Sequence, residues 1–159
     1  MSDPVEYTIV RNLQAAIGAA TVAGGYHYAI AATAVKLDPN HESEGMVAPD
    51  GPRPFALIEV LADTWAYNPA NEAILTTKLQ VHWTHDTDPT DDRSLLLTYF
   101  SGCADVERAI TQDITRGGLA VDTRITGRTH VPTDAAGKTW ATLDVEIRHY
   151  RDYGAPDGA

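Results

Sequence analysis

The residues of this sequence that most resemble a metal site lie in one short segment. His82 and His85 are three positions apart, and Asp86 and Asp88 follow them. Imidazole and carboxylate groups are common ligands of zinc and similar ions. The segment has the pattern of a strand end and a turn, and residues three apart on a strand point to opposite faces, which makes joint ligation awkward. Exposed histidines beside a turn are the favoured interpretation, and a small metal-dependent enzyme is an alternative.

The acidic run from Asp86 to Asp92 could also suit calcium. A calcium loop of the EF-hand type that began at Asp86 would need glycine at its sixth position and glutamate at its twelfth. The sequence has Asp91 and Leu97 there instead. We interpret these acids as caps for the helix that follows, since carboxylates are favourable near a helix N-terminus.

No pattern of nucleophile, base or phosphate-binding loop is present. None of the serines lies in a GxSxG motif, and Cys103 falls on the apolar side of an expected helix, where a buried thiol acts as a small apolar group. Two glycine pairs, Gly24 with Gly25 and Gly117 with Gly118, follow expected helices and lack the frames of nucleotide-binding loops. We therefore predict that the protein is not an enzyme, uses no cofactor and holds no metal.

Composition limits the class of protein further. The chain has 159 residues, of which 43% are hydrophobic, and its formal net charge is −10 at pH 7. A nucleic-acid binder needs clustered basic residues, and an anionic membrane surface also attracts basic ones. No apolar stretch approaches the ~20 residues that cross a bilayer, and the N-terminus lacks the pattern of a signal peptide. We expect synthesis in the cytoplasm, no specific binding of DNA and no membrane contact.

The elements that position these residues begin with a helix over residues 4–21. Asp3 is its expected N-cap, and Gly24 and Gly25 are expected to end the region. Its apolar residues recur at three- and four-residue spacing: Val5, Ile9, Leu13, Ile17 and Ala20.

A second helix is expected after the acidic run, ending near residue 115. Its apolar stripe consists of Leu96, Phe100, Cys103, Ile110 and Ile114. Gly102 predicts a kink or break near its middle, and Asp91, Asp92 or Ser94 is expected to cap its start. Gly117 and Gly118 are expected to cap its end, because glycine adopts the left-handed conformation without strain.

Five segments have the residue types or the alternation of strands: 26–37, 55–67, 74–84, 119–125 and 141–147. Residues 38–54 are expected to form a long loop, and 68–71, 85–92 and 132–138 to form turns. The order predicts an α+β fold, a mostly antiparallel sheet of about five strands with two helices packed on one face. Residues 1–153 are expected to be a single domain, and 154–159 a flexible tail.

Aromatic and charged residues on the expected strands are candidates for a protein interface. Aromatic residues and arginine are enriched at interfaces, and strand edges need protection from uncontrolled pairing. The alternative is that the aromatic rings of these residues complete the core and that their charged groups are solvated. The candidates are Trp65, Tyr67, Trp83, Arg124, Arg128, Asp144, Glu146 and Arg148.

Four stretches carry a resemblance to a known family. They are residues 23–27 (AGGYH), 104–110 (ADVERAI), 115–125 (TRGGLAVDTRI) and 140–148 (WATLDVEIR). The sequence resembles the small tail-terminator and minor tail proteins of long-tailed bacteriophages over both ends and the helix–strand–strand half. The match is weak over residues 38–53. These motifs mark packing and turns rather than chemistry.

The resemblance implies a structural virion protein. Such proteins form a homo-hexameric ring at the head-proximal end of the tail, which caps the tail tube and stops its polymerisation. The ring also provides the surface that joins the head, so the implied partners are further copies, the tail tube protein and a head-completion or connector protein. DNA passes through such a ring, and a channel lined by this acidic chain would let it slide. The alternatives are another tail or head–tail connector component and a monomeric ligand-binding module.

Overall fold

The computed structural model describes residues 3–38, 53–65, 71–87, 93–132 and 137–151. Tyr67, the centre of the expected 38–54 loop, the acids Asp88, Asp91 and Asp92, and the expected tail at 154–159 lie outside these ranges. The elements are α1 (Val5–Gly18), the short 3-10 helix η1 (Ala32–Ala34), β1 (Val35–Asp38), β2 (Phe55–Trp65), β3 (Glu72–Thr84), α2 (Ser94–Thr111), β4 (Ala120–Pro132) and β5 (Lys138–Tyr150).

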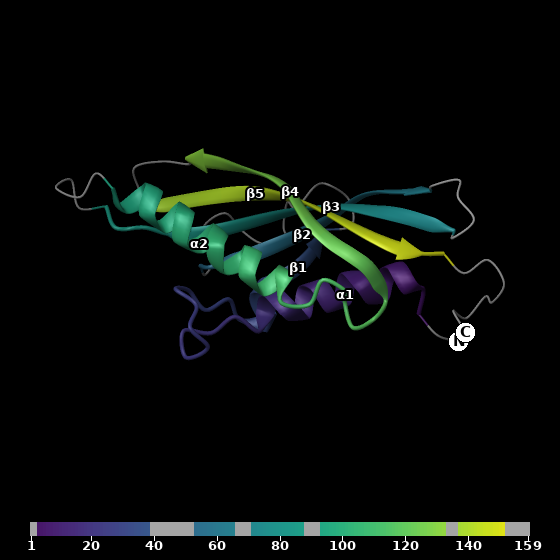
Figure 1. Ribbon diagram of the computed structural model, residues 1–159. Helices are drawn as coiled ribbons and strands as arrows, with labels where there is room; N and C mark the ends of the chain where they lie inside the picture. Colours follow the sequence, from purple (N-terminus) through teal and green to yellow (C-terminus); the bar gives the residue numbers. More distant parts are fainter. Residues whose placement is uncertain (1–2, 39–52, 66–70, 88–92, 133–136, 152–159) are drawn as a thin grey trace.

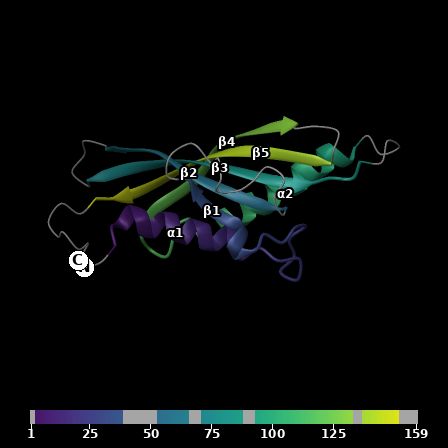
Figure 2. The same cartoon turned by 180° about the vertical axis from the view of Figure 1, so that it is seen from behind.

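The strands form one sheet in the order β1-β2-β3-β5-β4. β1 runs parallel to β2, and the remaining pairs are antiparallel. Figures 1 and 2 show α1 and α2 on the lower side of the sheet and no helix above its upper face. The predicted α+β class, with about five mostly antiparallel strands and two helices on one face, is confirmed.

The core lies between this face and the helices. On β3 and β5 every second residue is buried, as expected for strands with one covered face. Their buried side chains pack with residues such as Leu13 on α1 and Val106 on α2. Each large aliphatic side chain that is fully buried contributes ~1.5–3 kcal/mol relative to exposure. Packing of one apolar face therefore fixes the positions of both helices.

The first forty residues differ from expectation. α1 ends at Gly18, and of the expected 26–37 strand only residues 35–37 are a strand, as part of β1. The backbone of the intervening segment is bonded elsewhere, because the Tyr28 N–H donates to the Asp105 carboxylate (2.8 Å) and the Ile30 N–H to the Ala20 carbonyl (3.2 Å). Residue propensity favoured a strand there, but these tertiary contacts override it.

The predicted caps at the start of the chain are also wrong. Pro4, not Asp3, occupies the N-cap position of α1, and no side chain bonds to the free N–H groups there. Gly24 and Gly25 lie well beyond the helix, where their N–H groups donate to the carbonyls of Thr21 and Val22 at 3.0 Å. They close a turn rather than a helix.

The end of α2 is held by a side chain. Gly117 and Gly118 have the expected positive φ angles, 71° and 86°, but the helix has already ended at Thr111. Arg116 is fully buried, and its guanidinium donates to the carbonyls of Ile110 and Asp113. A cation that satisfies carbonyls in this way is favourable at a helix C-terminus. The glycines form the turn into β4 instead of the cap.

α2 is a continuous helix, so the predicted kink near Gly102 is wrong. A Cβ atom at Gly102 would lie 2.3 Å from the indole ring of Trp83. The glycine therefore gives a bulky ring from β3 room against the helix. The expected stripe is borne out in part: Cys103 and Ile110 are buried, Leu96 and Phe100 are exposed, and Ile114 lies beyond the end of the helix.

Candidate interaction surfaces

The uncovered face of the sheet carries charges of alternating sign. Across neighbouring strands, Asp122 pairs with Arg148 and Arg124 with Glu146. Along the adjoining row, Lys78 lies between Asp144 and Glu59. Opposite charges at facing strand positions stabilise a sheet by roughly 0.2–1 kcal/mol a pair. This face is therefore patterned for charge neutrality.

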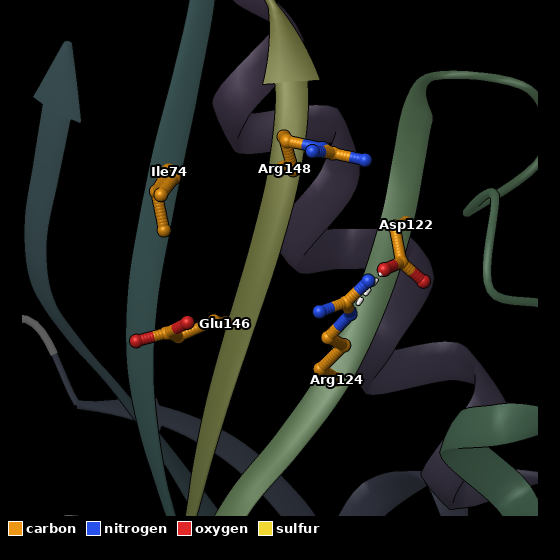
Figure 3. Close-up of a pocket in the computed structure, with 5 residues that line it drawn as sticks. All are labelled: Ile74, Asp122, Arg124, Glu146 and Arg148. Atoms are coloured by element: carbon orange, nitrogen blue, oxygen red, sulfur yellow. Dashed lines mark hydrogen bonds and ion pairs between the residues drawn. The ribbon is translucent and has the colours of Figure 1, made fainter. Parts of the chain in front are cut away.

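Three of the predicted interface residues meet in a shallow hollow on this face. Figure 3 shows Arg124, Glu146 and Arg148 around it together with Ile74 and Asp122, and the Nε of Arg124 donates to the Asp122 carboxylate. The hollow has a volume of about 110 Å³. Small-molecule sites usually occupy roughly 300–1,000 Å³. The hollow therefore suits a protein or solvent contact better than a ligand.

Arg128 does not join this group, although the sequence predicts that it does. The register of β4 shifts between Ile125 and Gly127, after which Arg128 faces the helices. Its guanidinium binds Glu107 at 2.8 Å and lies 5.8 Å from the ring centre of Phe100. A bulge of one residue moves every following side chain to the other face, and strict alternation cannot reveal it.

The predicted aromatic candidates separate into a core residue and an exposed one. Trp83 is 1% exposed and packs against Gly102, so its assignment to an interface is wrong. Trp65 is 52% exposed, and the guanidinium of Arg151 lies 3.6 Å from its ring centre. Tyr67 lies outside the described residues. Of the predicted aromatic candidates that the structure describes, Trp65 is the exposed one.

One surface that the sequence analysis missed lies on the outer side of α2. Leu96, Leu97 and Phe100 are 49%, 65% and 52% exposed, and we call them the α2 patch. The cation of Arg128 beside Phe100 places this patch next to β4, an edge strand of the sheet. The run of three leucines at 95–97 was an available signal, because one helix face cannot bury three consecutive residues.

A second missed surface is an apolar groove at the opposite edge. It is lined by Glu6, Tyr7, Val10, Leu37, Ile58, Val60 and Leu75, from α1, β1, β2 and β3. We call it the β1 groove. Its volume is about 320 Å³, and among its lining residues Tyr7 and Val60 are exposed. Apolar surface that is open to water in this way is typical of a contact region.

The histidine cluster of the sequence does not form a metal site in the described part of the chain. His82 stacks between the rings of Phe55 and Trp140, at 4.3 and 5.2 Å. Burial, and secondarily the charge of Arg53, lower the pKa of His82 from 6.5 to about 4. The Nδ1 of His85 bonds to the Asp86 carbonyl at 2.9 Å. The ring of His82 thus serves as a packing group.

Cys103 is buried against the sheet, as the sequence predicts. Burial raises the pKa of its thiol to about 12, so the thiol stays protonated at neutral pH. Because the thiolate is the nucleophile in cysteine chemistry, this residue is unsuited to catalysis.

No protein-family model matches the chain, and no curated protein matches it. Neither helix in the described ranges combines the length and the apolar character that crossing a bilayer requires.

Proposed function

We propose that this protein is a ring-forming structural subunit of a bacteriophage tail, a tail terminator. The observation that carries the proposal is the presence of two unlike apolar surfaces on opposite edges of one sheet. The α2 patch lies beside β4, and the β1 groove lies at β1. The resemblance of four sequence stretches to tail-terminator proteins supports the same assignment.

Two unlike surfaces on opposite edges favour head-to-tail association. When the patch of one copy enters the groove of the next, the first copy retains a free groove and the second a free patch, so the contact can repeat until a ring closes. The leucine and phenylalanine side chains of the patch match the apolar lining of the groove in character. We propose a ring of six copies, as in the family that the sequence resembles.

In this proposal the ring caps the tail tube, stops its polymerisation and joins the head. Its partners are the tail tube protein and a head-completion or connector protein, and its place is the head-proximal end of the virion tail. DNA passes through without specific binding, because the net charge of −10 opposes contact with phosphates. The runner-up is another component of the head–tail connector, which would form a similar ring.

The first experiment measures the mass of the protein by light scattering over a wide concentration range, alone and with purified tail tubes. We expect hexamers, or monomers that assemble on tube ends. A protein that stays monomeric at every concentration and ignores tubes would contradict the tail-terminator proposal. Rings that bind connectors and not tubes would instead support the runner-up.

Two matched variants locate the contact. Leu97→Asp places a charge in the α2 patch, and Val22→Asp places the same charge at a position of similar exposure, 62%, in the turn after α1. We expect the first to weaken association by at least about tenfold, since burying an unpaired charge is costly, and the second to leave it unchanged. Equal effects of the two variants would show that the α2 patch is not the contact.

A further inference from the structure

Three side chains with metal-binding groups converge at one end of the fold. Glu6 is on the first turn of α1, Asp63 on β2 and His149 on β5, and one ligand atom from each lies within 4.8 Å of the others. Both views place the start of α1 beside the end of β5 (Figures 1 and 2). Within the described residues, these three side chains form a group whose ligand atoms are close enough to share one metal ion.

The sheet leaves room for these groups to meet. Asp63 and His149 belong to strands on either side of β3, and the residue opposite His149 on β3 is Ala73. The small side chain of Ala73 does not separate them, and the Nε2 of His149 lies 3.1 Å from the Asp63 carboxylate. On β3 the residue opposite Asp63 is Leu75, so Asp63 and His149 meet along a diagonal across that strand.

The hydrogen bonds of His149 indicate which nitrogen can bind a cation. Its Nδ1 lies 3.2 Å from the backbone carbonyl of Tyr150, which only accepts, so Nδ1 donates its proton there. Nε2 faces the Asp63 carboxylate at 3.1 Å, so a proton or a metal ion must lie between these two atoms. Histidines that bind metals commonly donate the other N–H to a carbonyl in this way.

A proton or a metal ion could supply the positive charge, and the third group favours the metal. A proton shared by His149 and Asp63 needs no further partner, whereas two carboxylates and an imidazole match the charge and ligand types of a divalent ion. Metal–ligand bonds of about 2.0–2.2 Å place adjacent ligand atoms roughly 3–3.5 Å apart. The 3.1 Å between His149 and Asp63 fits this spacing.

We propose that Glu6, Asp63 and His149 bind one divalent ion of the zinc class. The nitrogen ligand favours zinc or a similar transition-metal ion such as cobalt over magnesium and calcium, which prefer oxygen. The ion ties the first turn of α1 to β2 and β5, so it stabilises the packing of the helix on the sheet. Neither the ring nor the tail assignment is needed for this inference.

The test uses the full-length protein without an affinity tag, stripped with a chelator and dialysed. Calorimetric titration with zinc is expected to give one ion per chain, and zinc is expected to raise the midpoint of thermal unfolding. Cobalt is expected to give visible absorption of a nitrogen and oxygen site. Absence of stoichiometric binding by either ion would overturn the proposal.

Variants test whether zinc binds at these three side chains or at other groups on the surface. Glu6→Gln and Asp63→Asn are expected to weaken zinc binding by about tenfold or more, and Glu6 lies at the helix start, where its replacement should spare folding. His27→Gln is the control, because His27 also pairs with an aspartate, Asp105 at 2.9 Å, outside this group. Zinc affinity equal to wild type in Glu6→Gln, or an imidazole found by NMR to be doubly protonated in metal-free protein that binds no zinc, would overturn the proposal.

Discussion

Gly102 and Trp83 show how one residue can set the distance between layers. Alanine usually stabilises an exposed helix position relative to glycine by up to ~1 kcal/mol. At Gly102 the added methyl group would meet the indole of Trp83 at 2.3 Å, well inside contact distance. The preference of the helix and the packing of the core therefore oppose each other at this position, and packing has the larger magnitude.

We predict that Gly102→Ala lowers the free energy of unfolding by about 1–3 kcal/mol, the usual cost of overpacking. Chemical denaturation measures the change. Ser101→Ala on the same helix is the control and is expected to have little effect. Adding Trp83→Phe to Gly102→Ala should recover part of the loss, and failure of that recovery would show that the ring is not the obstacle.

His82 makes a second prediction at this scale, a pH dependence. The unfolded chain binds the proton near pH 6.5, whereas burial and Arg53 hold the pKa of His82 in the folded chain at about 4. The stability that this residue contributes is therefore constant above pH 6.5 and falls as the pH drops from 6.5 to 4. Allowing for partial exposure of the ring, we expect a loss of about 1–2 kcal/mol.

Urea unfolding at several pH values in this window measures the loss for wild type and for His82→Phe. The phenylalanine keeps a ring between Phe55 and Trp140 and removes the titrating group. The difference between the two proteins isolates this histidine from His130, whose pKa is also lowered by burial. Parallel curves for the two proteins would contradict the assignment.

At the scale of elements, the segment between α1 and β1 depends on one buried carboxylate. Asp105 on α2 accepts the N–H of Tyr28 and the Nδ1 of His27, at 2.8 and 2.9 Å. It is 5% exposed, so its charge would be costly without these partners. Asp105 thus fastens the segment after α1 to the second helix.

We predict that Asp105→Ala destabilises the protein by roughly 1–3 kcal/mol, the cost of a buried donor left unsatisfied. Hydrogen exchange at the Tyr28 amide should accelerate more than exchange in β3 or β5. His27→Ala is expected to have a smaller effect, since the Tyr28 bond remains. Uniform acceleration across the protein would indicate global rather than local loosening.

The elements show which features sequence can predict. β3 and β5 were predicted because each alternates apolar and polar residues without interruption, and the burial follows that alternation. The segment before β1 has strand-like residues, but its backbone bonds go to Asp105 and Ala20, which are distant in sequence. The position of Arg128 depends on a bulge and that of Trp83 on a glycine of another element. Such contacts between elements leave no local pattern.

Of the candidate interaction surfaces, the sequence predicts those that depend on regular alternation within a strand and misses those that depend on contacts between elements. Arg124, Glu146 and Arg148 meet because regular alternation within β4 and β5 places them on one face. The α2 patch was missed because Leu96 and Phe100 fit a helical stripe one position away from the buried one. Glu6, Asp63 and His149 come from three different elements, so no spacing of residues along the sequence predicts that they lie together.

At the scale of the whole molecule, charge and apolar contact act in opposite directions on association. In the proposed ring each copy carries a net charge of −10, which opposes association, whereas contact between the α2 patch and the β1 groove would favour it. Salt screens repulsion between exposed charges over a Debye length of about 10 Å at 0.1 M. Added salt does not weaken contact between apolar side chains in this way.

We therefore predict that association strengthens severalfold when sodium chloride is raised from about 0.05 to 0.5 M. Light scattering at each salt concentration gives the association constant. Weaker association at high salt would show that ion pairs between copies outweigh both the repulsion and the apolar contact. Leu97→Asp should remain impaired at every salt concentration, because screening does not remove the cost of burying its charge.

The irregular edge at β4 has a consequence for how the protein avoids amyloid. β4 is an exposed edge of thirteen residues, long enough to template strand after strand into a fibril. Its register shifts at Ala120–Asp122 and Ile125–Gly127 divide that edge into short lengths. Continuous backbone pairing along β4 is thereby interrupted, so the addition of further strands at this edge is disfavoured.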